Sequence, residues 1–277
     1  MTWHTIRGHG GVQLTARVVG PSTAPPVVLL HGWGSSASAW AWQFSDPLLP
    51  AMFRLIALDL RGHGGSDTPE QGYQDSAVWA EDLAAVLRFA GRPALLVGWS
   101  YGGLVITDYL RVHGTSQVAG IVLVGAITEI GRGHPGARVG QAMRAALPAA
   151  LSEDPEVAVP ALTRFVRGMS DFPLPGELAQ RAIGDSLRVT PKVRTALFRR
   201  DVSSERVLTG LSVPALVTHG RRDAVVDPSA ATYAAGKIPG ARVRWFDGGH
   251  LPFVEHVREF NAMLLEFASH LWEGGPA

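Results

Sequence analysis

The stretch that decides the fold of this chain is Ala94-Leu95-Leu96-Val97-Gly98-Trp99-Ser100-Tyr101-Gly102. Its first four residues form an apolar run, which is typical of a strand buried on both faces. The last five fit the pattern G-x-S-x-G, and a helical pattern begins at about Tyr101. A strand, a sharp turn and a helix in this order expose a serine hydroxyl on a strained elbow. An ordinary glycine-rich turn with a helix-capping serine is the alternative, and the strand and helix on either side favour the elbow.

Similar apolar runs predict further strands along the chain. Buried parallel strands are expected at Val27–Leu30, Leu55–Leu58, Ile121–Val124 and Ala215–Thr218. The stretch Val12–Val19 is more polar and alternates, so it predicts an antiparallel edge strand. Helical patterns lie between the runs, with Ser76–Ala90 as the clearest. Alternation of strand and helix predicts an α/β fold with a doubly wound, mostly parallel sheet.

This alternation stops at about residue 127. From Ile127 to Glu205 there is no convincing buried strand, but there are short helical patterns such as Val139–Ala150 and Val157–Gly168. Such a segment is too long for a loop in a compact domain. We therefore predict a core of residues 1–126 and 207–277 and a helical lid of residues 127–206.

Two later loops offer partners for Ser100. Asp223 ends Gly220-Arg221-Arg222-Asp223 after one predicted strand, and His250 ends Gly248-Gly249-His250 after another. The order Ser, Asp, His is the one expected for a serine on such an elbow. We predict Ser100 as nucleophile, His250 as base and Asp223 as the acid that orients the base. Asp227 competes with Asp223, but a proline and a helical pattern follow it, which indicates a helix cap.

The loop His31-Gly32-Trp33-Gly34 directly follows the predicted strand at residues 27–30. In this arrangement such a loop donates one backbone N–H to the oxyanion, and the residue after the nucleophile donates another. The sequence therefore predicts an oxyanion hole made by the amides of Trp33 and Tyr101. The side chain of His31 is expected to hold the loop together through hydrogen bonds.

These motifs resemble the α/β-hydrolase superfamily over essentially the whole chain. Residues 59–66, Asp-Leu-Arg-Gly-His-Gly-Gly-Ser, look like the turn after the fourth strand of that family, where their role is structural. Residues 127 to about 206 would be the lid between strands six and seven. The loop at 31–34, the elbow and His250-Leu251-Pro252-Phe253 are similar to the pimeloyl-[acyl-carrier protein] methyl ester esterase group. In that group the positions of Trp33 and Tyr101 supply the oxyanion amides.

The triad and the resemblance together predict a carboxylic ester hydrolase that works through an acyl-enzyme. A cofactor-free perhydrolase and a thioesterase or methyl ester esterase acting on a carrier-bound acyl chain are the alternatives. A ligand sensor on a hydrolase scaffold would be free to lose catalytic residues, and all three are present here. Haloalkane dehalogenases and epoxide hydrolases carry Asp at the nucleophile position, so Ser100 argues against both.

The predicted lid carries two sets of residues of interest. Apolar side chains that suit the wall of an acyl pocket are Met143, Leu147, Phe165, Met169, Phe172 and Leu174. Basic side chains within one helical stretch are Arg188, Lys192, Arg194, Arg199 and Arg200. The basic set could dock an acidic carrier protein, although most basic helix faces are simply solvated.

Composition limits the other possibilities. The 277 residues, 46% of them hydrophobic, suffice for one large core, and the absence of cysteine excludes disulfides and thiolate chemistry. A net charge of +1 without runs of like charge gives no support for a nucleic-acid partner. No nucleotide-binding or metal-ligand spacing occurs, so we expect no cofactor and no metal. The N-terminus lacks a secretory signal and no apolar run could span a membrane, so we expect a cytoplasmic protein acting on a small acyl ester.

Overall fold

The computed structural model describes residues 1–273, and its centre is a single sheet of eight strands. Every strand predicted from an apolar run is present. The strands are β1 (Thr2–Arg7), β2 (Gln13–Val19), β3 (Pro26–Leu30), β4 (Arg54–Leu58), β5 (Ala94–Trp99), β6 (Val118–Val124), β7 (Ala215–Gly220) and β8 (Arg242–Phe246). All residues of β3, β5 and β7 are buried, as their unbroken apolar character predicts.

The strand order in the sheet is β1-β2-β4-β3-β5-β6-β7-β8. From β4 to β8 each neighbouring pair is parallel, whereas β2 is antiparallel to both β1 and β4. The prediction of an antiparallel strand at Val12–Val19 is confirmed, but its place at the edge is wrong. The edge is β1, in which four of six side chains are exposed. β1 has so little buried surface that it carries no apolar run, so the sequence pattern does not mark it.

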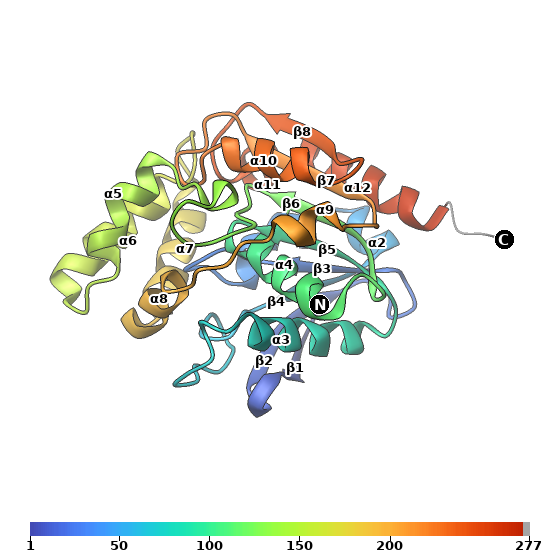
Figure 1. Cartoon of the computed structure of the whole chain (residues 1–277), viewed down its shortest axis with the longest axis horizontal. Coiled ribbons are helices and arrows are strands. Elements are labelled where there is room, and N and C mark those ends of the chain that lie inside the picture. Colours follow the sequence, from blue (N-terminus) through green and yellow to red (C-terminus); the bar gives the residue numbers. More distant parts are fainter. Residues whose placement is uncertain (274–277) are drawn as a thin grey trace.

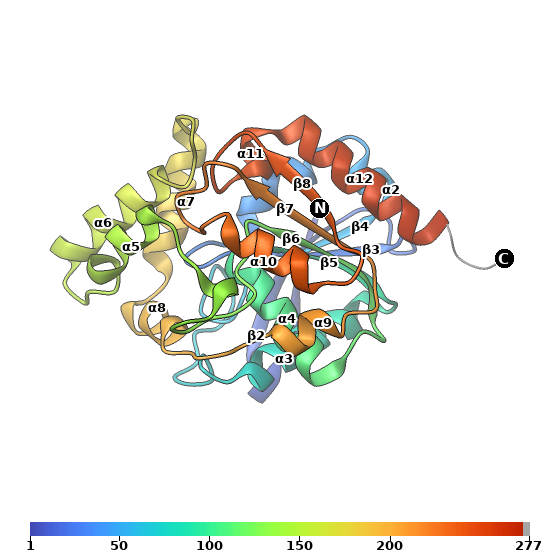
Figure 2. The same ribbon diagram turned by 45° about the horizontal axis from the view of Figure 1, so that its top comes forward.

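Helices cover both faces of the sheet. In Figure 2, α2 and α12 lie above β3, β5 and β6, and α4 and α9 lie below these strands. The helices of the two layers are α1 (Ala41–Phe44), α2 (Leu49–Met52), α3 (Ser76–Ala90), α4 (Tyr101–His113), α9 (Glu205–Thr209), α10 (Ser229–Lys237), α11 (Pro252–Glu255) and α12 (Val257–Glu273). None of the helices within residues 1–273 combines the length and the apolar character needed to cross a membrane.

Four more helices, α5 (Gln141–Ala150), α6 (Pro155–Arg167), α7 (Gly176–Arg188) and α8 (Pro191–Phe198), follow β6 and precede β7. They stand together at one end of the sheet, on the left in Figure 1. The contacts described below join them to the loops that leave the carboxyl ends of the strands. We call α5–α8 and their connections the lid; the boundaries at residues 127 and 206 stay a prediction.

The prediction that the basic residues between 188 and 200 lie within one helical stretch is wrong. Arg188 ends α7, a break separates it from α8, and Arg200 lies beyond the end of α8. Arg194 and Arg200 are each only 3% exposed. Arg194 donates a hydrogen bond to the carbonyl of Val189, and Arg200 pairs with a buried carboxylate. A guanidinium can be buried where acceptors satisfy its N–H groups, and only the tertiary structure reveals those acceptors.

The helix that follows the elbow packs very closely on the sheet. A Cβ atom at Gly102, in the first turn of α4, would lie 2.6 Å from the carbonyl oxygen of Leu30 and 3.0 Å from that of His31. Only a residue without a side chain allows this approach between α4 and the end of β3. The position of Ser100 relative to the loop after β3 therefore depends on a glycine at 102.

We expect Gly102→Ala to lower the free energy of unfolding by about 1–3 kcal/mol, because the added methyl group must push the helix off the sheet. Gly184→Ala is the matched control, since a Cβ at this exposed position of α7 would meet nothing within 4 Å. The control should gain about 0.5–1 kcal/mol from helix propensity. Urea unfolding measures both, and equal stability of Gly102→Ala and the wild type would contradict the close approach.

Candidate active site

Ser100 joins β5 to α4 in a strained conformation. Its φ of 54° is the only positive φ of a non-glycine residue among residues 1–273. Three backbone hydrogen bonds hold it there: the N–H of Ser100 donates to Val124, and the carbonyl of Ser100 accepts from Gly103 and Ile127. Backbone strain of this kind persists only where the surroundings enforce it, and it is concentrated at functional sites. The elbow expected from the sequence is present.

His250 and Asp223 form a buried pair near this elbow. The Nδ1 atom of His250 lies 2.7 Å from Oδ2 of Asp223, and both side chains are at most 1% exposed. Oδ1 of Asp223 accepts hydrogen bonds from the backbone N–H groups of Val225 at 2.8 Å and Val226 at 2.9 Å. With Asp223 as acceptor at Nδ1, the Nε2 atom of His250 is left free to take up a proton.

A second histidine borders the carboxylate of Asp223. His219, in the last part of β7, places Nε2 3.1 Å from Oδ2 of Asp223 and 3.0 Å from the carbonyl oxygen of Val226. Burial alone would raise the pKa of Asp223, but the charge and hydrogen bonds of His250 and His219 hold it below its usual value. Asp223 therefore stays ionised at neutral pH, as a residue that orients an imidazole must.

The loop after β3 lies directly against Ser100. A Cβ atom at Gly32 would come within 2.8 Å of the Cβ and 3.4 Å of the Oγ of Ser100. Trp33, the next residue, has its ring edge-on to Phe165 of the lid with 5.4 Å between ring centres. Tyr101 begins α4, and the helix itself offers no acceptor to the N–H groups of its first turn. Trp33 thus follows a residue that contacts Ser100, and Tyr101 follows Ser100 in the chain.

The lid contacts the loop that carries His250. The backbone N–H of His250 donates to the carbonyl of Met169 at 2.7 Å. Glu255 joins the same two segments, since its Oε2 accepts from the N–H of Gly249 and its Oε1 from the hydroxyl of Ser170, both at 2.7 Å. These contacts were not foreseen from the sequence, because Glu255 has the pattern of an ordinary residue in the first turn of a helix.

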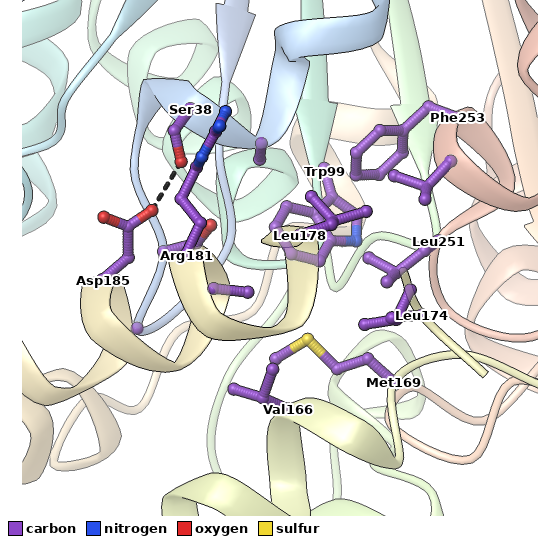
Figure 3. A pocket seen from close by; sticks show the side chains of 15 residues that line it. Ser38, Trp99, Val166, Met169, Leu174, Leu178, Arg181, Asp185, Leu251 and Phe253 are labelled. Carbon is purple, nitrogen blue, oxygen red and sulfur yellow. Dashed lines mark hydrogen bonds between the residues drawn. The ribbon is translucent and has the colours of Figure 1, made fainter. Parts of the chain in front are cut away.

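A narrow apolar pocket opens beside these residues (Figure 3). Gly34, Trp99 and Leu251 line it, and each is next in the chain to a predicted site residue. The lid contributes mainly aliphatic walls, which are Val166, Met169, Leu174 and Leu178. The pocket has about 500 Å³ of empty space including its mouth, but the centre of a water molecule can reach only about 40 Å³ of it. Such a slot suits a flat or unbranched apolar group.

The predicted pocket residues separate into three groups. Met169 and Leu174 line the slot. Met143, Leu147 and Phe165 do not, since they pack within the lid and against the core, where Phe165 contacts Trp33. Phe172 is 49% exposed, lies against His256 and does not line the slot. Amphipathic helices show which residues face inward, but not which inward residues border a cavity.

Comparison with known proteins identifies the family of this chain. A model of the Alpha/beta hydrolase family matches residues 27–263, which include all three predicted catalytic positions. The chain belongs to the α/β-hydrolase family. The pimeloyl-[acyl-carrier protein] methyl ester esterase of Aromatoleum aromaticum is 31% identical over 264 residues, covering 87% of this chain and 97% of that protein.

Two solved structures place this α/β-hydrolase among esterases of the same shape. The esterase RhEst1 from Rhodococcus sp. ECU1013 is 47% identical, with a TM-score of 0.93 over 98% of this chain and 100% of the other. The esterase EaEST from Exiguobacterium antarcticum is 26% identical, with a TM-score of 0.86 over 97% of this chain and 100% of the other. Both similarities extend through the lid.

Two buried histidines hold the loop after β3 in this α/β-hydrolase. Nε2 of His31 accepts the N–H of Leu60 at 3.0 Å while its Nδ1–H donates to the carbonyl of Gly32 at 2.8 Å. His63 accepts the N–H of Gly34 at 3.4 Å. The structural role expected for His31 and for the turn at residues 59–66 is therefore the role observed. Among residues 1–273 no group of three or more His, Asp or Glu is arranged to hold a metal ion.

Both histidines are neutral in the folded protein. Burial lowers the pKa of His31 to about 4, and burial together with repulsion by His31 lowers that of His63 to about 3. In the unfolded chain a histidine has a pKa of about 6.5. Between these values the unfolded state binds protons that the folded state excludes, so stability falls as pH falls.

We expect the free energy of unfolding to be nearly constant above pH ~7 and to drop below pH ~6.5, by about 1.4 kcal/mol per pH unit for each histidine. His63→Asn, whose amide can still donate to the carbonyl of Arg61, removes one titrating group. The variant should be less stable than the wild type at pH 7. Its free energy of unfolding should fall less steeply with falling pH, by the contribution of about one proton. Urea unfolding at intervals from pH 5 to 8 measures this, and identical slopes would contradict the assignment.

Proposed function

We propose that this ester hydrolase of the α/β-hydrolase family cleaves carboxylic esters through Ser100, His250 and Asp223, with an acyl-enzyme intermediate. The observation that carries the proposal is the strained elbow at Ser100 together with the buried pair of His250 and Asp223. These residues come from the carboxyl ends of three strands of one sheet, β5, β8 and β7. In open α/β sheets this edge is where active sites form.

The hydrogen bonds of His250 and Asp223 support the following chemistry. His250 accepts the proton of the Ser100 hydroxyl at Nε2, and the serine oxygen attacks the ester carbonyl carbon. Asp223 accepts a hydrogen bond from the Nδ1–H and stabilises the imidazolium, since two backbone N–H groups and two histidines keep it ionised. The imidazolium then returns the proton to the leaving alcohol. Water attacks the acyl-enzyme by the same route and releases the acid.

The charge that develops on the carbonyl oxygen needs donors that are already in place. We assign this role to the backbone N–H groups of Trp33 and Tyr101, because the loop at Gly32 touches Ser100 and Tyr101 follows it in the chain. Donors fixed before the reaction stabilise the transition state without the cost of reorganisation. His31 and His63 support the first donor by anchoring the residues on either side of Trp33.

The substrate we propose is a small ester with an apolar acyl or alcohol part. Trp99, Leu178 and Leu251 give the slot a mainly apolar wall, which favours such a group. Ser38, Arg181 and Asp185 also line it (Figure 3). A carrier-bound acyl chain, as the name of the Aromatoleum aromaticum relative suggests for that protein, has less support. Arg194 and Arg200, two of the five basic residues that would dock an acidic carrier, are buried. Nothing in residues 1–273 specifically favours a perhydrolase.

The proposed function predicts that Ser100→Ala folds normally and loses about 10⁴ to 10⁶ of kcat, as do other enzymes that lose the nucleophile of such a triad. Hydrolysis of 4-nitrophenyl butyrate measures the activity, and thermal unfolding checks the fold. Mass spectrometry after treatment with a fluorophosphonate should find one covalent adduct on the wild type and none on the variant. Activity within tenfold of the wild type would refute the mechanism.

The slot predicts that chain length is set by the lid. Ala182→Phe, on the wall formed by α7, should lower kcat/KM for an octanoate ester by roughly tenfold relative to an acetate ester, since a filled subsite excludes the longer chain. Gln180→Phe, at an exposed position of the same helix, is the matched control and should leave the ratio unchanged. Acyl and alcohol chains are lengthened in separate series. If the ratio of kcat/KM for long and short esters is the same in both variants, in both series, the slot is not a subsite.

A further inference from the structure

The buried arginine at the end of the lid has no role in the mechanism described so far. Arg200 lies just beyond α8, where the chain leaves the lid and returns toward β7. Its side chain and that of Asp108, in the middle of α4, are both 0% exposed. Nη2 of Arg200 donates to both carboxylate oxygens of Asp108, at 2.8 and 2.7 Å, and to the hydroxyl of Ser76 at 3.1 Å. The lid is thus tied to the helix that follows the nucleophile.

The remaining contact of this guanidinium reaches the proposed oxyanion hole. Nη1 of Arg200 donates a hydrogen bond of 2.9 Å to the hydroxyl of Tyr101. The guanidinium carbon lies 5.9 Å from the ring centre of Tyr101 and 5.9 Å from that of Trp79. The two rings pack edge to face with 5.8 Å between centres. Burial raises the pKa of Tyr101 to about 12, so its hydroxyl is a neutral acceptor for Arg200 at any working pH.

This arrangement fixes both ends of Tyr101. Its backbone is tied to the strained elbow, because the carbonyl of the preceding Ser100 accepts from Gly103 and Ile127. Its side chain is tied to a cation that is itself locked by a bidentate carboxylate. A buried ion pair contributes little net stability compared with apolar residues of the same size. The geometry that it imposes on Tyr101 is therefore the more significant consequence.

We propose that Arg200 is a positioning residue for the oxyanion hole, which through the hydroxyl of Tyr101 keeps the backbone N–H of that residue aimed at the developing oxyanion. The inference rests on the proposed function, since it assumes that Ser100 is the nucleophile. It also gives the lid a second effect besides shaping the slot. A displacement of the lid at Arg200 acts on the N–H that stabilises the transition state.

The test removes the hydroxyl and keeps everything else. Tyr101→Phe retains the ring and the pair between Arg200 and Asp108, so the fold should persist. Loss of one oxyanion donor outright costs about 10²–10³ in kcat, and a misaimed donor should cost less, about tenfold or more in kcat/KM. The inhibition constant of an alkyl boronic acid, which forms a tetrahedral adduct with the serine, should rise by a similar factor. That of the product alcohol should change less than about twofold, because it carries no carbonyl oxygen for the oxyanion hole to bind.

Ser76→Ala is the matched control, since it removes another hydrogen bond of Arg200 and leaves Tyr101 in place. It should keep kcat/KM and the boronic acid affinity within about twofold of the wild type. Wild-type values for Tyr101→Phe, or equal losses in both variants, would overturn the positioning role. Ser100→Ala distinguishes a failure of the proposed function from a failure of the positioning role of Arg200. If it still hydrolyses ester and binds the boronic acid, the proposed function fails; if only Tyr101→Phe behaves as wild type, the inference alone fails.

Discussion

The strained backbone at Ser100 is the constraint on which the rest of this structure depends. A serine with φ of 54° is unfavourable in isolation, and it persists because β6 and the loop after it satisfy its N–H and its carbonyl. The contact of Gly102 with the end of β3 brings the helix close enough for this turn. The parallel sheet, the short strand-to-helix connection and the loop after β3 all meet at this one residue.

Around the elbow, the buried charge of Asp223 and the buried imidazoles of His31 and His63 have hydrogen-bond partners. Asp223 accepts two backbone N–H groups and faces two histidines, so it stays ionised without solvent. His31 and His63, in contrast, are buried in the neutral form, and each accepts a hydrogen bond from a backbone N–H. The same low-dielectric surroundings that make unpaired polar atoms costly also strengthen the interactions proposed for catalysis.

Contacts from several of its segments connect the lid to this centre. The carbonyl of Met169 accepts the N–H of His250, and Glu255 reinforces that contact through Ser170. At the other end, Arg200 reaches Tyr101 across a buried ion pair. The similarity to a 47% identical esterase extends over 98% of this chain and includes the lid.

The sequence by itself determined the elements that depend on local patterns. Apolar runs marked the buried strands, and periodicity marked α3. The strand, turn and helix around Ser100 predicted the elbow, because the residues that signal it follow one another in the chain. Chain order also predicted that Asp223 and His250 belong together, and they form a hydrogen-bonded pair. The edge strand β1, the burial of Arg200 and the walls of the slot were decided only by the tertiary structure. Each depends on contacts between residues far apart in the sequence. A local sequence pattern does not show which distant acceptor will bind a given donor.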